Sequence, residues 1–450
     1  MNHLAEAYQI LTQYYKTPAT NLKLLVNRYL ERHHSQDAAN TSRTVYGVIR
    51  KEKLLELVIA TFSRTPLKKI DLPTATLLKI GIFLMLFSEG FPDYAIVNET
   101  VSSAPKKSKR FINGILRTVG RQKDKASAAM DGAQDPAIRH SLHPGLVDRI
   151  RQLTGDRFQT TLDYLDSEPI FHLKPNPAAI SYGDLLQEVK AADIAVKEIP
   201  KFQSLEIKQP GKIKDLITTH KAYFQNTASQ FISFLAAQYA ESAVLDCCAA
   251  PGSKTVTLKR QKPELQVAAA DINHSRLRML QPVIRHNQLG DVSLLAMNAL
   301  FPALKNAFDL IMVDAPCSSV GTIRKNPDLK LKTDSAVIRR NAGHQIEILD
   351  ALLRQFPGRC FLYSVCSFTA PETDDVLDAI SQKHTIDTID IAPLAKDFGF
   401  EFKRGRHGVY LLPSPSLNND LFYISLFSDG GGCTRPAEPT PEVSPQRPPE

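Results

Sequence analysis

Cysteine, aspartate and lysine residues gather in three short segments in the second half of the chain. The segments read DCCAAPGSKT (246–255), DAPCSSVG (314–321) and YSVCS (363–367). Each follows a short apolar run of the kind that forms a buried strand. Thiols can act as nucleophiles and carboxylates can accept or share protons, so these three segments are the candidates for covalent and acid–base chemistry.

The first segment runs from a predicted strand into a predicted helix. Its small residues let the backbone approach a ligand, and the helix start offers free N–H groups. It is not a phosphate-binding Walker A loop, because the first glycine and the spacing of that motif are missing. Taken alone, it fits a tight strand-to-helix turn equally well.

Two cysteines, Cys317 and Cys366, occupy equivalent positions just beyond two strands that we expect to be neighbours. A single cysteine is usually a small buried hydrophobic residue. Two of them in polar turns, one beside Asp314, favour a functional pair. The buried structural interpretation is kept for Cys247, Cys360 and Cys433.

The second half of the chain alternates short apolar runs with helical stretches. This alternation predicts a doubly wound α/β sheet, whose ligands lie at the carboxyl ends of the strands. We expect strands at 243–247, 266–271, 292–297, 308–314, 359–365, 409–412 and 421–427.

The first 120 residues show apolar residues at helical spacing, for example Leu4, Ala7, Tyr8 and Leu11, and little strand-like alternation. The sequence therefore predicts five regions. They are an all-α domain (1–125), a linker (126–140), a small α+β subdomain (141–215), an α/β domain (216–428) and a disordered tail (429–450).

Composition limits the class of protein. The 450 residues carry a net charge of +8, which favours a polyanionic partner. Six cysteines are too few for a disulfide scaffold, and without a CxxC pair a zinc site or other metal site is not expected. The sequence has no signal peptide and no apolar run long enough to span a membrane, so we expect a protein of the reducing cytoplasm with no membrane partner.

Together, DCCAAPGSKT, DAPCSSVGTIRKNPD and YSVCSFTAPE resemble the motifs of the Nop/Sun family of RNA cytosine-5 methyltransferases, in order and spacing over about residues 140–428. Nearer the N-terminus, KIGI (79–82), AIVNETV (95–101) and FINGILR (111–117) resemble the NusB-type RNA-binding helical domain. This pair of domains is the arrangement of the bacterial Sun-type methyltransferases of 16S ribosomal RNA. The resemblance therefore implies a Rossmann-like methyltransferase domain behind an all-α NusB-like domain.

The resemblance also implies a mechanism. Cys366 corresponds to the family nucleophile that adds to carbon 6 of cytosine, and Cys317 to the cysteine that assists release. Asp314 is placed to hydrogen-bond the N3/N4 edge of the base, in a protonated form or sharing a proton with the ring. The target base must be splayed out of its stack.

The implied cofactor is S-adenosyl-L-methionine, lying across the strand ends. Asp271 should accept from the ribose hydroxyls, although a helix cap would explain this residue too. Asn298 should meet the adenine edge. The full set of expected cofactor-binding residues is Cys248, Ala249, Ala250, Pro251, Gly252, Ser253, Lys254, Asp271, Asn298 and Asp314.

The sequence departs from the family pattern at five positions. Ser253 replaces a usual glycine, which questions a positive φ there. Asn298 replaces a usual aspartate, and Val365 a usual threonine. Thr373 and Asp374 replace a usual Glu-Asn pair. None of these changes removes a group that the covalent chemistry requires.

RNA, most of all 16S ribosomal RNA, is the expected partner, and we expect the protein to act as a monomer. One basic cluster comprises Lys106, Lys107, Lys109 and Arg110, and three more basic residues, Lys221, Arg324 and Lys325, lie near the proposed site. Such clusters hold phosphates, although a solvated surface is the common alternative. The alternatives left open are methylation of transfer RNA or DNA, and a non-catalytic RNA-binding assembly factor.

Overall fold

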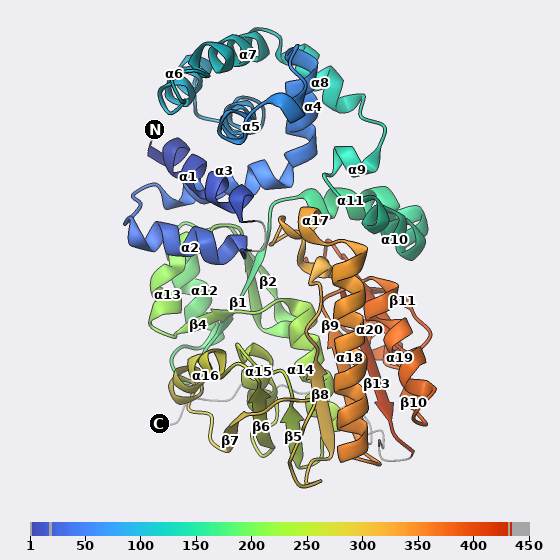
Figure 1. Cartoon of the computed structure of the whole chain (residues 1–450). Coiled ribbons are helices and arrows are strands. Elements are labelled where there is room, and N and C mark those ends of the chain that lie inside the picture. Colours follow the sequence, from blue (N-terminus) through green and yellow to red (C-terminus); the bar gives the residue numbers. More distant parts are fainter. Residues whose placement is uncertain (1, 18–19, 431–432, 434–450) are drawn as a thin grey trace. The chain divides into compact units, whose positions relative to one another are not determined.

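The computed structural model describes residues 2–17, 20–430 and 433. The chain forms two compact units. The first contains residues 1–169 and 318–338, and the second contains residues 170–317 and 339–450. Figure 1 colours the elements along the chain. The tail at 429–450, expected to be disordered, lies outside the described residues except for 429, 430 and 433.

The first unit is all helical. Its long central helix, α5, begins after Asp71, whose carboxylate accepts from the backbone N–H of Thr74 and so caps the helix. From Thr74 to Met85 every residue of α5 is buried, because the helix is apolar on all sides. This central helix spans Leu72–Phe87, and around it pack α1 (Asn2–Lys16), α2 (Leu22–Arg32), α3 (Ala38–Arg50), α4 (Glu52–Phe62), α6 (Asp93–Ser102) and α7 (Lys109–Arg121).

The boundaries between the expected regions differ from those in the structure. The segment expected to be a linker, 126–140, lies within α8 (Lys123–Asp131) and α9 (Pro136–Arg139) and the turns after them. The next two helices, α10 (Pro144–Thr154) and α11 (Phe158–Asp166), belong to the first unit rather than to a subdomain that runs on to residue 215. Polar composition alone does not distinguish a linker from an exposed helix.

Residues 318–338, which follow Cys317, are held within the first unit. Lys330 in the short helix α17 (Leu329–Lys332) is 1% exposed, and its ammonium donates to Asp166 at 2.7 Å and to the carbonyl of His140 at 3.0 Å. Burial lowers the pKa of Lys330 to about 8, although Asp166 opposes this change. A buried ammonium is costly unless it is paired, so these bonds anchor the segment.

The second unit begins with a small antiparallel sheet in the order β2-β3-β1-β4. Its apolar core, which includes Leu173 and Leu205, lies under two helices. The elements are β1 (Phe171–Pro175), α12 (Tyr182–Ala191), β2 (Val196–Ile199), β3 (Ser204–Ile207), α13 (Lys214–Thr218) and β4 (Ala222–Phe224). The sheet continues past residue 215, because β4 pairs with β1.

The main sheet of the second unit has the order β11-β12-β13-β9-β8-β5-β6-β7, and β10 also pairs with β13. Strands β5 to β9 are parallel, and β10 to β13 extend the sheet in antiparallel pairs. The strands are β5 (Ala243–Asp246), β6 (Gln266–Asp271), β7 (Val292–Ala296), β8 (Leu310–Asp314), β9 (Cys360–Val365), β10 (Asp387–Ile389), β11 (Glu401–Arg404), β12 (Val409–Leu412) and β13 (Phe422–Ser428).

The helices of this α/β region are α14 (Thr227–Tyr239), α15 (Ser253–Gln261), α16 (His274–His286), α18 (Ser335–Gln355), α19 (Asp374–Ser381) and α20 (Ala392–Asp397). The first residues of α18 belong to the first unit and the rest to the second. The expected fold class, a Rossmann-like α/β domain preceded by an all-α domain and a small α+β part, is confirmed.

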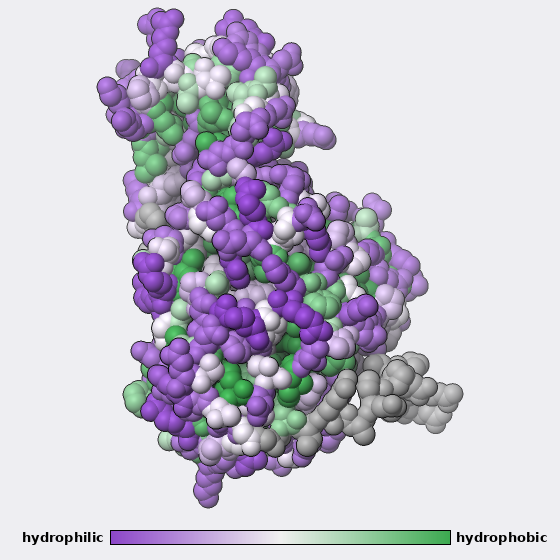
Figure 2. Space-filling model, turned by 90° about the vertical axis from the view of Figure 1, so that its right-hand side faces the viewer, coloured by the Kyte–Doolittle hydropathy of each residue, from purple (hydrophilic) through white to green (hydrophobic). Residues whose placement is uncertain are grey.

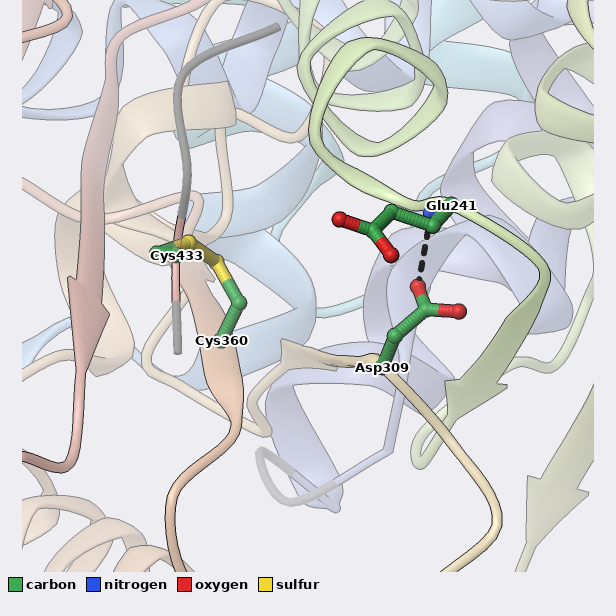
Figure 3. The surroundings of a disulfide bond; sticks show 4 residues. All are labelled: Glu241, Asp309, Cys360 and Cys433. Atoms are coloured by element: carbon green, nitrogen blue, oxygen red, sulfur yellow. Dashed lines mark hydrogen bonds between the residues drawn. A yellow bond between two sulfur atoms is a disulfide. The ribbon is translucent and has the colours of Figure 1, made fainter. Parts of the chain in front are cut away.

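Cys360 and Cys433, both expected to be buried structural residues, form a disulfide that was not predicted from the sequence (Figure 3). Cys360 is 1% exposed, as expected, whereas Cys433 is half-buried. Cys360 is the first residue of β9 and lies opposite Ser428 at the end of β13, so the chain leaving β13 passes beside it. The two Cα atoms are 5.1 Å apart, a usual separation for a disulfide. The sequence could not reveal this pair, because 73 residues separate the two cysteines.

Figure 3 also shows the hydrogen bond between Asp309 and the backbone of Glu241. Asp309, just before β8, accepts hydrogen bonds from three successive backbone N–H groups, those of Glu241, Ser242 and Ala243, at 2.7–2.8 Å. This carboxylate fixes the start of β5 against β8.

The face of the molecule shown in Figure 2 is mostly hydrophilic, with apolar side chains in scattered patches. Within the described part of the chain, no helix is both long and apolar enough to cross a membrane.

Candidate active site

The strand order reverses between β5 and β8. From β5 the chain proceeds to β6 and β7 on one side, and then returns to β8 and β9 on the other. In an open parallel sheet the ligand crevice lies at the carboxyl ends of the strands at such a switch point. The three chemistry-bearing segments leave β5, β8 and β9 at this edge.

The structure brings two of the predicted site residues together. The sulfur atoms of Cys317 and Cys366 are 3.4 Å apart, and both side chains are half-buried. Their strands are adjacent and in register, with Asp314 of β8 opposite Ser364 of β9. By contrast, Cys247 is 2% exposed, and burial raises its pKa well above the usual value, which leaves it a poor nucleophile. The pair at the two strand ends is thus the candidate reactive centre.

A carboxylate and an ammonium lie at the same edge. Lys254 donates to Oδ2 of Asp314 at 2.6 Å, and the hydroxyl of Ser364 donates to Oδ1 at 3.0 Å. Burial alone would lower the pKa of Lys254, but Asp314 and, to a smaller extent, Cys366 and Asp246 raise it. Lys254 therefore remains a cation, and its charge favours the thiolate form of Cys366.

A pocket opens beside this group. It is lined by the residues that link β5 to α15 together with Asp314, namely Asp246, Cys248, Ala249, Ala250, Pro251, Gly252, Ser253, Lys254 and Asp314. All of these except Asp246 belong to the predicted cofactor-binding set.

Asp246 is the residue that the sequence prediction missed. It is 1% exposed, and its Oδ2 accepts from the hydroxyl of Thr255 at 2.7 Å, while its Oδ1 is buried without a partner among the described residues. Burial raises the pKa of Asp246 to about 7. Because an unpaired buried carboxylate oxygen in a pocket suits a cationic ligand group, the pocket fits the ammonium of the methionine part of S-adenosylmethionine. Its place at the end of the first parallel strand was the signal that could have identified it.

Asp271 and Asn298, predicted to contact the cofactor, lie at the ends of β6 and β7. Asp271 is 5% exposed and accepts from the backbone N–H of Asn273 at 2.8 Å and of Ala250 at 3.1 Å. It thus stabilises two turns at the edge of the sheet. Asn298 is half-buried and accepts from the N–H of Leu300 at 3.1 Å. Each group keeps acceptor capacity beyond these bonds.

Two family models match the chain. Residues 1–121 match the NusB family, and residues 232–428 match the family described as 16S rRNA methyltransferase RsmB/F. The chain is 30% identical over 366 residues to ribosomal RNA small subunit methyltransferase B of Salmonella agona (strain SL483), covering 77% of this chain and 82% of the relative. The chain belongs to the ribosomal RNA small subunit methyltransferase B family. A probable member from Coxiella burnetii is 28% identical over 395 residues, covering 85% of this chain and 90% of the relative.

Solved structures agree on the fold. The crystal structure of PH0851 has a TM-score of 0.73 at 18% identity and covers 95% of this chain and 99% of its own. NSun6 from Pyrococcus horikoshii, crystallised with SFG, has a TM-score of 0.52 at 16% identity, covering 64% of this chain and 98% of its own. Members of the methyltransferase B family use S-adenosylmethionine, and the cofactor prediction is confirmed.

The departure from the family pattern at Ser253 has a structural explanation. The positive φ of this turn, +96°, falls on Gly252 and not on Ser253, which begins α15. A Cβ on Gly252 would lie 2.0 Å from a methyl carbon of Leu280. The glycine is therefore required at 252, and a serine is tolerated at 253.

The departures at Val365, Thr373 and Asp374 are buried and well packed. Val365 ends β9 opposite Tyr423 of β13. The hydroxyl of Thr373 lies 2.6 Å from that of Tyr410, and Asp374 accepts from the hydroxyls of Tyr410 at 3.0 Å and Tyr423 at 2.7 Å. The polar side chains of Thr373 and Asp374 therefore have hydrogen-bond partners within this chain.

The expected basic contacts fall into two groups. Lys106, Lys107, Lys109 and Arg110 are exposed at the start of α7, as a phosphate-binding cluster requires. Arg324 differs from expectation because it is 5% exposed. It donates to the carbonyl of Glu168 at 2.9 Å and stacks on Tyr164. A side chain occupied in this way holds the 318–338 segment rather than a phosphate.

Proposed function

We propose that this chain transfers a methyl group from S-adenosylmethionine to carbon 5 of a cytosine in 16S ribosomal RNA, through a covalent adduct between Cys366 and carbon 6. The observation that carries the proposal is the 3.4 Å separation of the Cys317 and Cys366 sulfur atoms beside Asp314. The nucleophile acts at carbon 6 and the group for release at the adjacent carbon 5, so the two side chains must lie close together. A purely RNA-binding protein has no need of such a pair.

Each side chain has a role in this proposal. The thiolate of Cys366 adds to carbon 6, and the electrons of the C5–C6 double bond make carbon 5 nucleophilic. Asp314 hydrogen-bonds the N3/N4 edge of the ring, and Lys254 keeps the charges of Asp314 and Cys366 compensated. When bound, S-adenosylmethionine supplies the methyl group from its sulfonium. Cys317 then assists removal of the proton from carbon 5, the C6–sulfur bond breaks, and the double bond returns.

The cofactor is held in the pocket of residues 248–254. Asp246 takes the ammonium of its methionine part through Oδ1, and Asp271 accepts from the ribose hydroxyls. Asn298 meets the adenine edge. Ile272 follows Asp271 and is 71% exposed, so its apolar side chain is available to pack against the flat face of the adenine.

Three observations support 16S ribosomal RNA as the substrate. The family model is described as a 16S rRNA methyltransferase, the curated relatives are named for the small ribosomal subunit, and the NusB match covers the region with the exposed basic cluster. A substrate of this kind assigns the protein to the cytoplasm. We propose that it acts as a monomer, with phosphate contacts made by Lys106, Lys107, Lys109 and Arg110.

Two cysteine variants test this function. Cys366→Ala should abolish methyl transfer, because it removes the thiol that adds to carbon 6. Cys317→Ala should accumulate a covalent protein–RNA complex, because the adduct still forms but its release is slowed. The measurements are bisulfite sequencing of 16S ribosomal RNA from cells with and without the protein, and denaturing gels of each variant with RNA. Normal methylation by Cys366→Ala would refute the proposed nucleophile. Absence of any new 5-methylcytosine would favour the assembly-factor alternative.

A further inference from the structure

One buried amide touches both loops that carry the thiols. Gln345 lies in α18 and is 0% exposed. Its Nε2 donates to the carbonyl of Pro316 at 2.8 Å, the residue immediately before Cys317. Its Oε1 accepts from the hydroxyl of Tyr363 at 3.2 Å, in the strand that leads to Cys366. The two ends of a single side chain thus contact the backbone of one loop and the strand of the other.

A buried carboxylate continues this connection to the far side of Cys366. Glu372 is 0% exposed, and its Oε2 accepts from the hydroxyls of Ser367 at 2.6 Å and Thr369 at 2.9 Å. Its backbone carbonyl lies 2.9 Å from the Tyr363 hydroxyl. Gln345, Tyr363 and Glu372 therefore form a continuous polar scaffold from the residue before Cys317 to the residue after Cys366.

We infer that Gln345 is a positioning residue, which fixes the separation of the two thiols by holding the Pro316–Cys317 loop against the strand of Cys366. Hydrogen bonds away from water resist displacement, because nothing replaces a lost partner. The bond to Pro316 is part-buried, because Pro316 itself is exposed, and the backbone N–H of Ala315 also donates to the carbonyl of Ser364 at 2.9 Å. The amide of Gln345 adds a side-chain contact directly before Cys317 that reaches the strand of Cys366. This inference rests on the proposed function and assigns a further residue to the same site.

The two halves of the reaction depend on this contact unequally. Cys366 is fixed by β9, by Ser367 and by Glu372, and so keeps its place when the amide is lost. Cys317 lies in a loop and loses one of the contacts that hold this loop against β9. Attack on carbon 6 should therefore survive better than release, and the covalent complex with RNA should accumulate. A loss of folding would instead lower the rates of attack and of release together.

The test variant is Gln345→Met, which keeps the length and volume of the side chain but removes both hydrogen bonds. The matched control is Gln355→Met in the same helix, whose amide donates to the carbonyl of Leu304 at 2.6 Å, away from the thiols. Tyr363→Phe is a milder second variant, which removes a single hydroxyl. It keeps the inference testable if Gln345→Met does not fold.

For Gln345→Met we expect kcat to fall about 10- to 100-fold, with KM for RNA and for S-adenosylmethionine within about two-fold of the parent values, because the amide is assigned no contact with either substrate. The fraction of protein trapped on RNA should rise toward that of Cys317→Ala. Tyr363→Phe should show the same pattern to a smaller extent, and Gln355→Met should match the parent. Parent-like kcat with no trapped complex in Gln345→Met, or the same loss in Gln355→Met, would overturn the inference.

A measurement without RNA separates this inference from the proposed function. Diamide oxidises two adjacent thiols to a disulfide, and mass spectrometry of the digested protein follows the Cys317–Cys366 cross-link. We expect the cross-link to form at least about ten-fold more slowly in Gln345→Met than in the parent and in Gln355→Met. Equal rates would refute the positioning role even where Cys317→Ala traps RNA. A slower rate would support it even where the trapping experiment fails and the proposed function is wrong.

Discussion

Two buried lysines, one in each unit, have opposite surroundings. In the first unit Lys79 pairs with Glu52 and with Glu56, the latter at 2.8 Å, and the hydroxyl of Tyr15 donates to Glu52 at 2.5 Å. In the second unit Lys254 pairs with Asp314 at 2.6 Å, and the Asp314 side chain is 28% exposed. Asp246, near both of them, has an oxygen without a partner among the described residues.

The difference separates structural from functional polar groups. The Lys79 group is closed in the sense that its ammonium, carboxylates and phenol bind one another, although the Glu56 side chain is itself 34% exposed. Burial alone would lower the pKa of Lys79, but Glu52 and Glu56 raise it and keep it charged. The Lys254 group is open toward a pocket, and its carboxylates still have capacity for a ligand. A buried ion pair by itself is weak evidence for function, whereas an incomplete one in a pocket is a candidate site.

The largest expected effect on stability comes from opening the closed group. Lys79→Met leaves the Glu52 carboxylate buried without its cation, and breaking such a pair typically costs about 3–5 kcal/mol. We expect the free energy of unfolding of the helical unit to fall by this amount, as measured by urea denaturation followed by circular dichroism. A change below about 1 kcal/mol would mean that the Lys79 group is as open as the Lys254 group.

In the open group, replacing the lysine by methionine should lower activity more than it lowers stability. Lys254→Met removes the cation that compensates Asp314 and Cys366, and losing one preorganised electrostatic partner typically lowers kcat by about 10²–10³-fold. Unfolding of this variant should change less than that of Lys79→Met, because Asp314 retains access to water. Radiolabelled methyl transfer and denaturation curves, measured side by side, check this. If Lys254→Met kept full activity but lost much of its stability, the Lys254 group would be structural rather than functional.

A smaller effect, on how the free energy of unfolding depends on pH, is expected at Asp246. Burial raises its folded-state pKa to about 7 from a usual value of 3.8, so the folded state favours the protonated form. The stability associated with this proton is full below about pH 4 and is lost as the pH rises through 7. Asp246→Asn cannot titrate, so its unfolding free energy without cofactor should fall by less than that of the parent between pH 5 and pH 8. Over this range the difference should reach at most about 3 kcal/mol, because about two pKa units of the shift lie above pH 5.

Calorimetry supplies the control for Asp246→Asn. The variant should bind S-adenosylmethionine at least about ten-fold more weakly, since a neutral amide replaces the partner of the ammonium. If the unfolding free energies of parent and variant change equally with pH, and both bind S-adenosylmethionine equally well, Asp246 belongs with the closed structural groups.

Short-range patterns in the sequence predicted much of this arrangement. Alternating apolar runs located seven of the nine strands of the main sheet to within a few residues, because a buried strand must be apolar over most of its length. The two strands that were missed, β10 and β11, are short and mostly exposed. The rule that ligands lie beyond the carboxyl ends of such strands then placed Cys317 and Cys366 at one edge. Their 3.4 Å separation follows from the adjacency of β8 and β9.

What the sequence did not predict depends on long-range contacts. Gln345 lies 29 residues from Pro316, and only the packing of α18 shows that its amide is buried against that loop. Cys433 and Cys360 are joined across 73 residues. Arg324 looked like a phosphate contact by charge, yet the packing of its segment buries it on Tyr164. Residue type sets what a side chain can do, and the tertiary partners decide which role it takes.

The central claim concerns which sulfur attacks the base. The most direct measurement is mass spectrometry of the RNA-linked peptide from Cys317→Ala incubated with S-adenosylmethionine and 16S ribosomal RNA. The account predicts a nucleotide joined to the peptide that contains Cys366, with the base carrying one added methyl group. A linkage to any other residue, or no linked peptide from a variant that binds RNA normally, would contradict it.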